Sequence, residues 1–269
     1  MRVVVCALAK NEHIYINEWV KHYVDLGFDK IYLYDNDDNN SKYIGNYINE
    51  KYADKVVLKN VRGLQRRNFQ HDIYTRFYWK YAMSFDYCLF CDIDEFLVGI
   101  TNIKDFLKDK NFKQMRIKWR LFGDDNKIKR DISIPVTQFF KKEITESLTN
   151  DLLRKNNLER QAKFILKGGM NNVYINSCHY GSFGINNTPI PSILPSGKPC
   201  KSKTAIDEDY SEETVYLNHY ITKTLDEFIN QKLNRNDAVF NQRLKMNYYW
   251  RVNKKTPKKI AYLKKLGLE

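Results

Sequence analysis

The first hundred residues alternate between continuous apolar runs and stretches in which apolar side chains recur every three or four positions. The continuous runs, at residues 2–8 and 87–91, are typical of strands covered on both faces, and residues 30–34 and 55–61 predict two further strands. The periodic stretches between them predict amphipathic helices, at residues 12–26, 41–52 and 66–85. Gly27 follows the first helix, where glycine commonly ends one. The pattern predicts a mostly parallel, doubly wound α/β sheet with helices on both faces.

The second half of the chain has a less regular pattern. It predicts three further strands and one helix, at residues 114–122, 172–178, 214–217 and 225–233. Residues 186–205 carry four prolines and predict a long irregular loop. We therefore expect an irregular C-terminal half that belongs to the same domain.

Composition and charge exclude two broad classes of protein. The chain has 269 residues, of which 43% are hydrophobic, so it can bury a full core and is not intrinsically disordered as a whole. No apolar run approaches the ~18 residues of a membrane span. The N-terminal apolar run is too short for a signal sequence, so we expect a cytoplasmic protein.

The five cysteines agree with that location. Cys88 and Cys91 form a C-x-x-C pair, but no second pair completes a zinc site. An offset of three residues on a strand places them on opposite faces. We interpret the cysteines as reduced core residues.

Polar side chains follow each of the first four predicted strands. Ligands bind at the carboxyl ends of the strands in open α/β sheets, and the residues found there are Lys10, Asn11, Glu12, Asp35, Asn36, Asp37, Asp38, Arg62, Arg66, Arg67, Asp92, Asp94 and Glu95. Acidic, amide and basic groups would thus share one edge of the sheet.

The strongest single motif is Asp92-x-Asp94, directly after a wholly apolar strand. On an extended chain, residues two apart point to the same side, so both carboxylates could face one ion or one diphosphate. A divalent cation would relieve their mutual repulsion. The motif predicts a metal site, against the alternative of a solvated turn.

The usual backbone motifs for nucleotide phosphates are absent from the sequence. There is no G-x-G-x-x-G after the first strand and no G-x-x-x-x-G-K-[ST]. A nucleotide could still bind through side chains, with Asp35 or Asn36 at a uracil edge and Arg66 or Arg67 at a phosphate.

Several short segments together resemble glycosyltransferase family 92 and related family 2-like enzymes, over roughly residues 3 to 235. The segments that carry the resemblance are Ala9-Lys10-Asn11-Glu12, Tyr15-Ile16, Glu18-Trp19-Val20, Leu26-Gly27, Ile31-Tyr32-Leu33-Tyr34-Asp35-Asn36, Asp92-Ile93-Asp94-Glu95-Phe96-Leu97, Trp119, Phe122-Gly123-Asp124 and Leu217-Asn218-His219-Tyr220-Ile221-Thr222-Lys223. The resemblance implies a GT-A (Rossmann-like) fold, a UDP-sugar donor and a divalent metal, Mn²⁺ or Mg²⁺.

The resemblance also implies roles for individual residues. Asn11 and Glu12 would lie under the nucleoside, and Asp35 would contact the uracil. Asp92 would approach the ribose or the metal, and Asp94 would ligate the metal. A second ligand would come from His219, for which a hydrogen-bonded core histidine is the alternative.

An inverting transfer also needs a general base for the acceptor hydroxyl. The candidates are Asp124, Asp125 and Glu95, and we favour Asp124 because it directly follows the Phe-Gly pair; an ordinary turn is the alternative. His179 and Trp119 are candidates for contact with the acceptor sugar, and a structural role for His179 is equally consistent with the sequence.

The C-terminal segment is strongly basic. Residues 245–269 contain eight basic residues and one acid, more than half of the chain's net charge of +13. Thr256 and Pro257 predict the start of a helix, whose lysines and apolar stripe fit an anionic membrane surface. The alternative is a helix whose apolar stripe packs on the domain.

We therefore predict a metal-dependent enzyme that transfers a hexose, with galactose as the first expectation, from a UDP-sugar to an oligosaccharide or lipid-linked glycan in capsule, lipopolysaccharide or other surface-polysaccharide synthesis. Its location would be cytoplasmic or peripheral on the inner face of the cell membrane. The expected parts are a nucleotide-sugar half (1–125), an acceptor and metal-completing half (126–235) and a basic helical tail (236–269).

Two other functions fit parts of the sequence. A metal-dependent phosphohydrolase or nuclease could use Asp92, Asp94 and Glu95, but it predicts a second carboxylate cluster, for which only Asp124 and Asp125 are available. A nucleic-acid-binding module would fit the pI of about 9.3, but no recognition motif is present and the charge concentrates in the tail. We expect no nucleic-acid partner.

Overall fold

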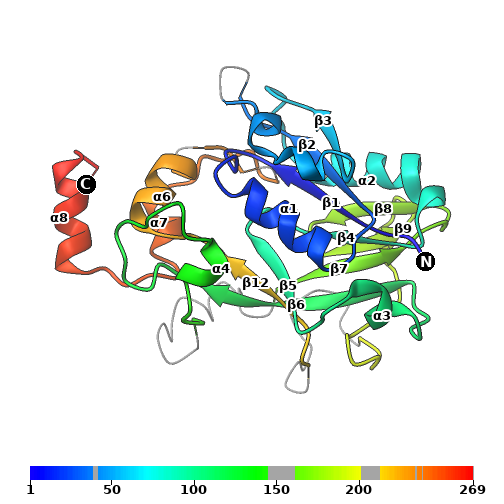
Figure 1. Ribbon diagram of the computed structural model, residues 1–269. Helices are drawn as coiled ribbons and strands as arrows, with labels where there is room; N and C mark the ends of the chain where they lie inside the picture. The colour runs from blue at the N-terminus through cyan, green and yellow to red at the C-terminus, as the bar shows by residue number, and fades with distance from the viewer. Residues whose placement is uncertain (39–41, 145–160, 201–212, 234, 238, 269) are drawn as a thin grey trace.

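The computed structural model describes residues 1–38, 42–144, 161–200, 213–233, 235–237 and 239–268. Its centre is a nine-stranded sheet in the order β3-β2-β1-β4-β7-β6-β12-β5, with β11 (Ser192–Ile193) paired to β6 (Figure 1). Seven of the nine strands run in one direction, and only β5 and β7 run against them. The predicted α/β class and mostly parallel sheet are confirmed.

The N-terminal half matches the predicted alternation. Its parallel strands are β1 (Val3–Ala9), β2 (Lys30–Asp35), β3 (Val56–Asn60) and β4 (Tyr87–Phe90). Alternate residues of β1 belong to two different apolar clusters. One contains Val5 and Trp19 of α1 (Ile16–Asp25); the other contains Cys6 and Phe77 of α2 (Phe69–Tyr81). Helices therefore cover both faces of the sheet.

One predicted helix is wrong in type. Residues 42–52 form two short 3₁₀ helices, η1 (Ile44–Tyr47) and η2 (Glu50–Tyr52), and residues 39–41 lie outside the described part. Gly45 has low helix propensity, and the Asn49 side chain accepts a hydrogen bond from the backbone N–H of Lys51. These local bonds compete with a continuous helix. The predicted helix at 66–85 is shorter, because Asn68 has a left-handed backbone (φ 59°) and η3 (Ala82–Ser84) follows α2.

The second half contributes more strands than the sequence predicts. The strand β6 (Gln114–Phe122) was predicted, whereas β5 (Glu95–Val98) and β7 (Ala162–Lys167) were missed. β7 lies antiparallel between β4 and β6 and joins the two parallel parts of the sheet. β12 (Tyr216–Tyr220) begins later than predicted and pairs with β6 on one side and β5 on the other. His219 therefore lies within a central strand.

A small antiparallel sheet covers the α2 side. It consists of β8 (Val173–Ser177), β9 (Tyr180–Phe183) and β10 (Thr188–Pro189). Two short helices, α3 (Ile103–Leu107) and α4 (Val136–Phe139), lie in the connections around β6. The predicted long loop thus contains β10 and β11, and its residues 201–205 lie outside the described part.

Three helices gather at one end of the molecule, at the left of Figure 1: α6 (Leu225–Gln231), α7 (Met246–Tyr249) and α8 (Pro257–Lys265). They share an apolar cluster of Leu225, Phe228, Tyr249 and Leu263. The tail helix therefore packs Leu263 on the domain, whereas Leu266 at its end is exposed (45%). No helix in the described parts of the chain has the length and apolar character needed to cross a membrane.

Candidate active site

The acidic motif forms a turn between β4 and β5. The backbone N–H of Glu95 donates to the carbonyl oxygen of Asp92 (3.2 Å), so the chain is not extended at this point. The prediction that Asp92 and Asp94 lie on one side of an extended chain is therefore wrong. The turn directs the two carboxylates to different partners: Asp92 meets Lys163, whereas Asp94 meets His219 and Lys232.

Asp92 is held by a lysine and an amide. Its Oδ2 lies 2.7 Å from Nζ of Lys163, and its Oδ1 accepts a hydrogen bond of 2.7 Å from Nε2 of Gln70. Burial alone would raise the pKa of Asp92, but the charge and hydrogen bond of Lys163, together with His219, outweigh burial and the pKa is lowered. The side chain is one-third exposed (33%), so it remains accessible to a ligand.

Asp94 is buried among three nitrogen-bearing side chains. Its Oδ1 lies 3.4 Å from Nε2 of His219, and its Oδ2 lies 2.5 Å from Nζ of Lys232 and 3.6 Å from Nζ of Lys223. Burial opposes ionisation, but the charges of Lys232 and Lys223 together with His219 hold the pKa of Asp94 well below its usual range. Asp94 is therefore an anion at neutral pH.

Glu95 and His219 face each other across neighbouring strands. They are paired in the register of β5 and β12, and Oε1 of Glu95 lies 4.0 Å from Nδ1 of His219. Burial raises the pKa of Glu95 well above its ordinary value and lowers the pKa of His219. The imidazole is thus neutral at neutral pH, which is the state that ligates metals.

The donor set fits a divalent cation. Asp94, Glu95 and His219 each offer one ligand atom, and the three atoms lie within 4.8 Å of one another. Oε1 of Glu95 and Nδ1 of His219 are buried and make no hydrogen bond within the described part of the chain. Carboxylate oxygens with one imidazole suit Mn²⁺. The sequence predicts Asp92, Asp94 and His219 as metal ligands. The potential ligand group found in the structure contains Glu95 in place of Asp92.

The residues predicted for the nucleoside lie at the same edge of the sheet. Asp35 is buried at the end of β2, and its Oδ2 lies 4.0 Å from Nη1 of Arg62. The Asn36 amide donates to two backbone carbonyls, those of Val61 and Leu64. Asn36 thus fixes the loop after β3, whereas Oδ2 of Asp35 makes no hydrogen bond within the described residues.

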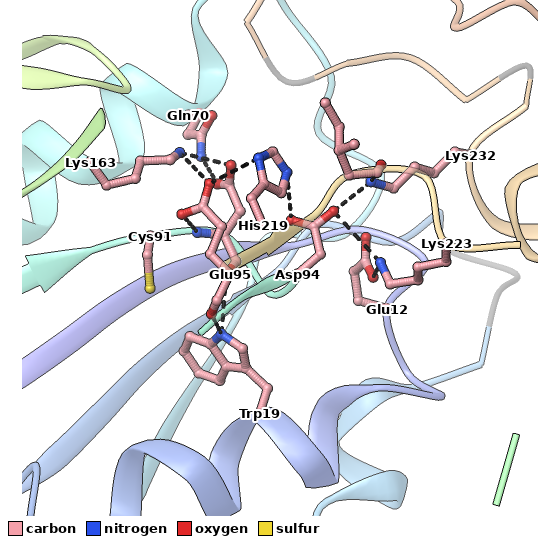
Figure 2. Close-up of polar contacts among 12 residues, drawn as sticks. Glu12, Trp19, Gln70, Cys91, Asp94, Glu95, Lys163, His219, Lys223 and Lys232 are labelled. Carbon is pink, nitrogen blue, oxygen red and sulfur yellow. Dashed lines mark hydrogen bonds and ion pairs between the residues drawn. The ribbon is translucent and has the colours of Figure 1, made fainter. Parts of the chain in front are cut away.

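Asn11 and Glu12 connect the first strand to the C-terminal half. The Asn11 amide donates to the carbonyl oxygen of Gln231 (3.3 Å), and its backbone φ is positive (56°). Glu12 lies 3.2 Å from Nη1 of Arg235 and 3.6 Å from Nζ of Lys223. The structure therefore brings Glu12 to the Asp94 group through a shared lysine (Figure 2).

The two arginines predicted for a phosphate lie on the surface. Arg66 pairs with Asp72 at 2.6 Å, with both side chains exposed, and Arg67 is also exposed. Arg66 lines a crevice of about 10 Å³ together with Lys10 and Asn36. No ion pair between Arg66 or Arg67 and the buried acids is present among the described residues.

The two residues predicted for the acceptor flank the acidic group. The ring of Trp119 packs edge-on against His219 (4.4 Å between centroids) and against His179 (5.4 Å). Nδ1 of His179 contacts the carbonyl oxygen of Ala162 (2.8 Å), and burial lowers the pKa of His179 to about 4. A neutral His179 and Trp119 thus form one wall beside the metal-ligand candidates.

The predicted base Asp124 is engaged by the tail. Its carboxylate accepts a hydrogen bond from the Tyr249 hydroxyl and pairs with the Lys259 ammonium, and all three side chains are buried. Asp125 is half-buried, and its Oδ2 accepts from the backbone N–H of Lys141 (3.0 Å). Both aspartates line a cavity of about 310 Å³. The cavity lining does not include Asp94, Glu95 or His219. Of the two aspartates, Asp125 is the one without a buried ion pair, and it is therefore the better candidate for contact with a substrate.

Lys259→Met should lower the stability of the protein by about 3 kcal/mol, because removing one partner leaves the buried Asp124 carboxylate uncompensated. Thermal and urea unfolding would measure the loss. The matched control is Lys258→Met, which removes an exposed lysine from the same helix and should change stability by less than ~0.5 kcal/mol. Equal stability of the two variants would show that the ion pair does not hold the tail.

Sequence reasoning missed the cations of the site. Lys163 lies inside the otherwise apolar strand β7, and a lysine in such a run is itself a signal for a buried partner. Lys223, Lys232 and Arg235 follow β12 over thirteen residues and all reach Glu12 or Asp94. Their spacing gave no periodic signal, because a loop and the end of α6 place them.

No family model matches the chain, and no curated protein matches it either. Among solved structures, Staphylococcus aureus TarS 1-349 in complex with UDP is 18% identical at a TM-score of 0.37, over 62% of this chain and 47% of that chain. The galactosyltransferase LgtC in complex with donor and acceptor sugar analogues is 12% identical at a TM-score of 0.26, over 43% and 46%. The matched parts span less than half of those chains, and membership of family 92 stays a prediction.

Proposed function

We propose that this chain is a glycosyltransferase of the GT-A type that takes a UDP-sugar as donor. The observation that carries the proposal is the buried group of Asp94, Glu95 and His219 beside Asp92, at the edge where the parallel strands end. In open α/β sheets that edge is where nucleotides bind. The site combines several carboxylates, a neutral imidazole and buried ammonium groups. Such a combination suits the transfer of a sugar from a nucleoside diphosphate.

The proposed ligands of Mn²⁺ or Mg²⁺ are Oδ1 of Asp94 and Nε2 of His219, since both side chains are buried and the two atoms lie 3.4 Å apart. Glu95 would then receive the Nδ1–H of His219 and fix the ring, as carboxylates commonly do behind a ligating histidine. The cation, when bound, supplies positive charge that stabilises the departing diphosphate. We assign Asp92, which is one-third exposed, to the ribose or to the outer edge of the cation site.

The uracil of the donor would lie near Asp35. The buried Oδ2 of Asp35 has no hydrogen bond in the described residues and can accept one from a uracil N–H. Glu12 and Asn11 would support the nucleoside from below. Arg66 and Arg67, which lie on the surface, are proposed as outer contacts of the nucleotide.

The acceptor would lie beside Trp119 and His179, since both rings border the acidic group. Trp119 is only 7% exposed, so a sugar would meet the outermost atoms of its ring. We propose that the acceptor is a glycan, free or lipid-linked, in surface-polysaccharide synthesis. We also propose that the transferred sugar is a hexose and that transfer inverts the configuration at its anomeric carbon. The division of the chain into residues 1–125, 126–235 and 236–269 also stays a proposal.

The hydrolase alternative is less well supported. A two-metal phosphohydrolase needs a second set of ligands about 4 Å from the first. Within the described ranges, only one group of three potential metal ligands is present, and Asp124 is paired with Lys259 instead.

Release of UDP from UDP-sugars tests the proposed function. We expect Mn²⁺-dependent hydrolysis or transfer with at least one UDP-hexose, and at least a tenfold loss in excess chelator that added Mn²⁺ restores. Manganese binding by the protein alone should be measurable by calorimetry and lost in His219→Gln. Full activity in chelator, together with no manganese binding, would remove the metal from the proposal.

The tail offers a separate test of membrane docking. Because Leu263 and Lys259 face the domain, only the outer side of α8 is available to a membrane. The double variant Lys258→Gln and Lys265→Gln should weaken binding to vesicles with anionic lipid by about 30-fold, at ~1 kcal/mol for each lysine. Turnover of a soluble acceptor should not change. Equal sedimentation of both proteins with the vesicles would leave α8 as a packing helix only.

A further inference from the structure

Three basic side chains from one segment converge on the acidic group. Lys223 follows β12, Lys232 follows α6, and Arg235 lies three residues further on. Lys232 and Lys223 approach Oδ2 of Asp94 at 2.5 and 3.6 Å, and Arg235 approaches Glu12 at 3.2 Å. Figure 2 shows Lys223 and Lys232 on the side of Asp94 that faces away from His219. The cations thus occupy the edge of Asp94 opposite the metal-ligand candidates.

Lys223 is buried without a hydrogen bond. Its side chain is only 2% exposed, and its Nζ has no hydrogen-bond partner within the part of the chain that the structure describes. The nearest carboxylate oxygens, one of Glu12 and one of Asp94, are both 3.6 Å away. Its backbone lies in the left-handed region (φ 57°), which is costly for a lysine and is found mainly where surrounding structure imposes it. The fold therefore holds this ammonium group between two carboxylates and over the ring of Tyr15, 4.2 Å from Nζ to the ring centroid, with no hydrogen bond among the described residues.

The local charge is not balanced by the acids at this edge. Three cations face the two carboxylates of Glu12 and Asp94. The next acid near Lys223, Glu227, is already paired with Arg130 at 2.6 Å. One positive charge is therefore in excess. Burial of an uncompensated charge is expensive, and desolvation indeed lowers the pKa of Lys223. A divalent cation at Asp94 and His219 would add two further positive charges. A ligand with two or more negative charges would satisfy the group.

We propose that Lys223, Lys232 and Arg235 form the binding site for the diphosphate of the donor. This inference rests on the proposed function and assigns residues that the sequence motifs left without a role. In the structure Lys232 pairs with Asp94. When the diphosphate binds, its oxygens accept hydrogen bonds from the Lys223 and Lys232 ammonium groups, and Lys223 thereby gains the hydrogen bonds it lacks. Because the leaving group is a nucleoside diphosphate, the same ammonium groups stabilise the charge that develops on it as the bond between the anomeric carbon and the diphosphate oxygen breaks.

Calorimetric titration with UDP, UMP and uridine at saturating Mn²⁺ tests the assignment through binding alone. For the wild-type protein we expect affinity to fall in the order UDP, UMP, uridine. Lys223→Met should weaken UDP binding at least tenfold, weaken UMP less and leave uridine unchanged, because only phosphate contacts are lost. Lys223→Arg keeps the charge and should recover part of the UDP affinity. Lys258→Met, on the outer side of α8, is the matched control and should bind UDP as the wild type does.

Two outcomes would overturn the inference in distinguishable ways. If the wild type binds UDP and Lys223→Met, Lys232→Met and Arg235→Met all bind it equally well, the three cations do not form the diphosphate site, while the proposed function stands. If the wild type binds no uridine nucleotide, the proposed function fails and the inference fails with it. Should Lys223→Met not fold, Lys223→Gln and Arg235→Gln give the same comparison of UDP with uridine.

Discussion

Asp94→Asn is expected to reduce UDP-sugar turnover at least 10³-fold, which corresponds to about 4 kcal/mol of transition-state stabilisation. The Asp94 carboxylate contacts His219 through one oxygen and both Lys223 and Lys232 through the other. An amide keeps the shape but loses the charge that would hold a divalent cation. It also leaves Lys223 and Lys232 buried with less compensation. Both effects act on the same step, the departure of the diphosphate.

The control for Asp94→Asn is Asp25→Asn, an exposed aspartate at the end of α1 that pairs with Lys21 on the surface. That variant should turn over as the wild type does. Because Asp94 is buried among cations, circular dichroism and a melting curve must accompany the rate measurement, and the assay temperature should lie well below the midpoint. Normal turnover by folded Asp94→Asn would place the metal site elsewhere.

The parallel part of the fold could be predicted because it depends on local pattern. Strands buried on both faces read as continuous apolar runs, and β1 and β4 follow this rule along their whole length. β2 is mostly buried, whereas β3 is a half-buried edge strand that ends in Lys59 and Asn60. β7 follows the rule less well, because Lys163 interrupts its apolar run. β5 has only four residues and begins five residues after β4 ends, so the sequence offers no separate strand signal. Short strands held by long-range pairing depend on tertiary structure rather than on pattern.

The acids of the site were predictable, whereas their partners were not. Asp92 and Asp94 stand out because they follow an apolar strand directly. Lys163, by contrast, meets Asp92 and Glu95 from a strand about seventy residues away. Such a pair forms only because β7 inserts antiparallel between β4 and β6. The turn at residues 92–95, closed by the bond from Glu95 N–H to the Asp92 carbonyl, gives different partners to two carboxylates that the motif alone would place together.

Substitution of the general base is expected to cause the second large loss of transfer rate. Of the three candidate carboxylates, Asp124 is engaged by Tyr249 and Lys259, and Glu95 is fully buried. Asp125 is half-buried and opens onto the cavity of about 310 Å³. Asp125→Asn should therefore slow transfer by about 10²–10⁴-fold and leave UDP affinity nearly unchanged, because a base acts on the acceptor hydroxyl.

Parallel measurements on Asp124→Asn and Glu95→Gln separate the three candidates. Asp124→Asn should lower the melting temperature, because Lys259 loses its buried partner, and should keep most of its transfer rate per folded molecule. Glu95→Gln should weaken manganese binding together with rate, since Glu95 faces Nδ1 of His219. A strong loss of transfer in Asp124→Asn with unchanged stability and UDP affinity would return the role of base to Asp124. Wild-type transfer by both Asp124→Asn and Asp125→Asn would leave Glu95 as the candidate.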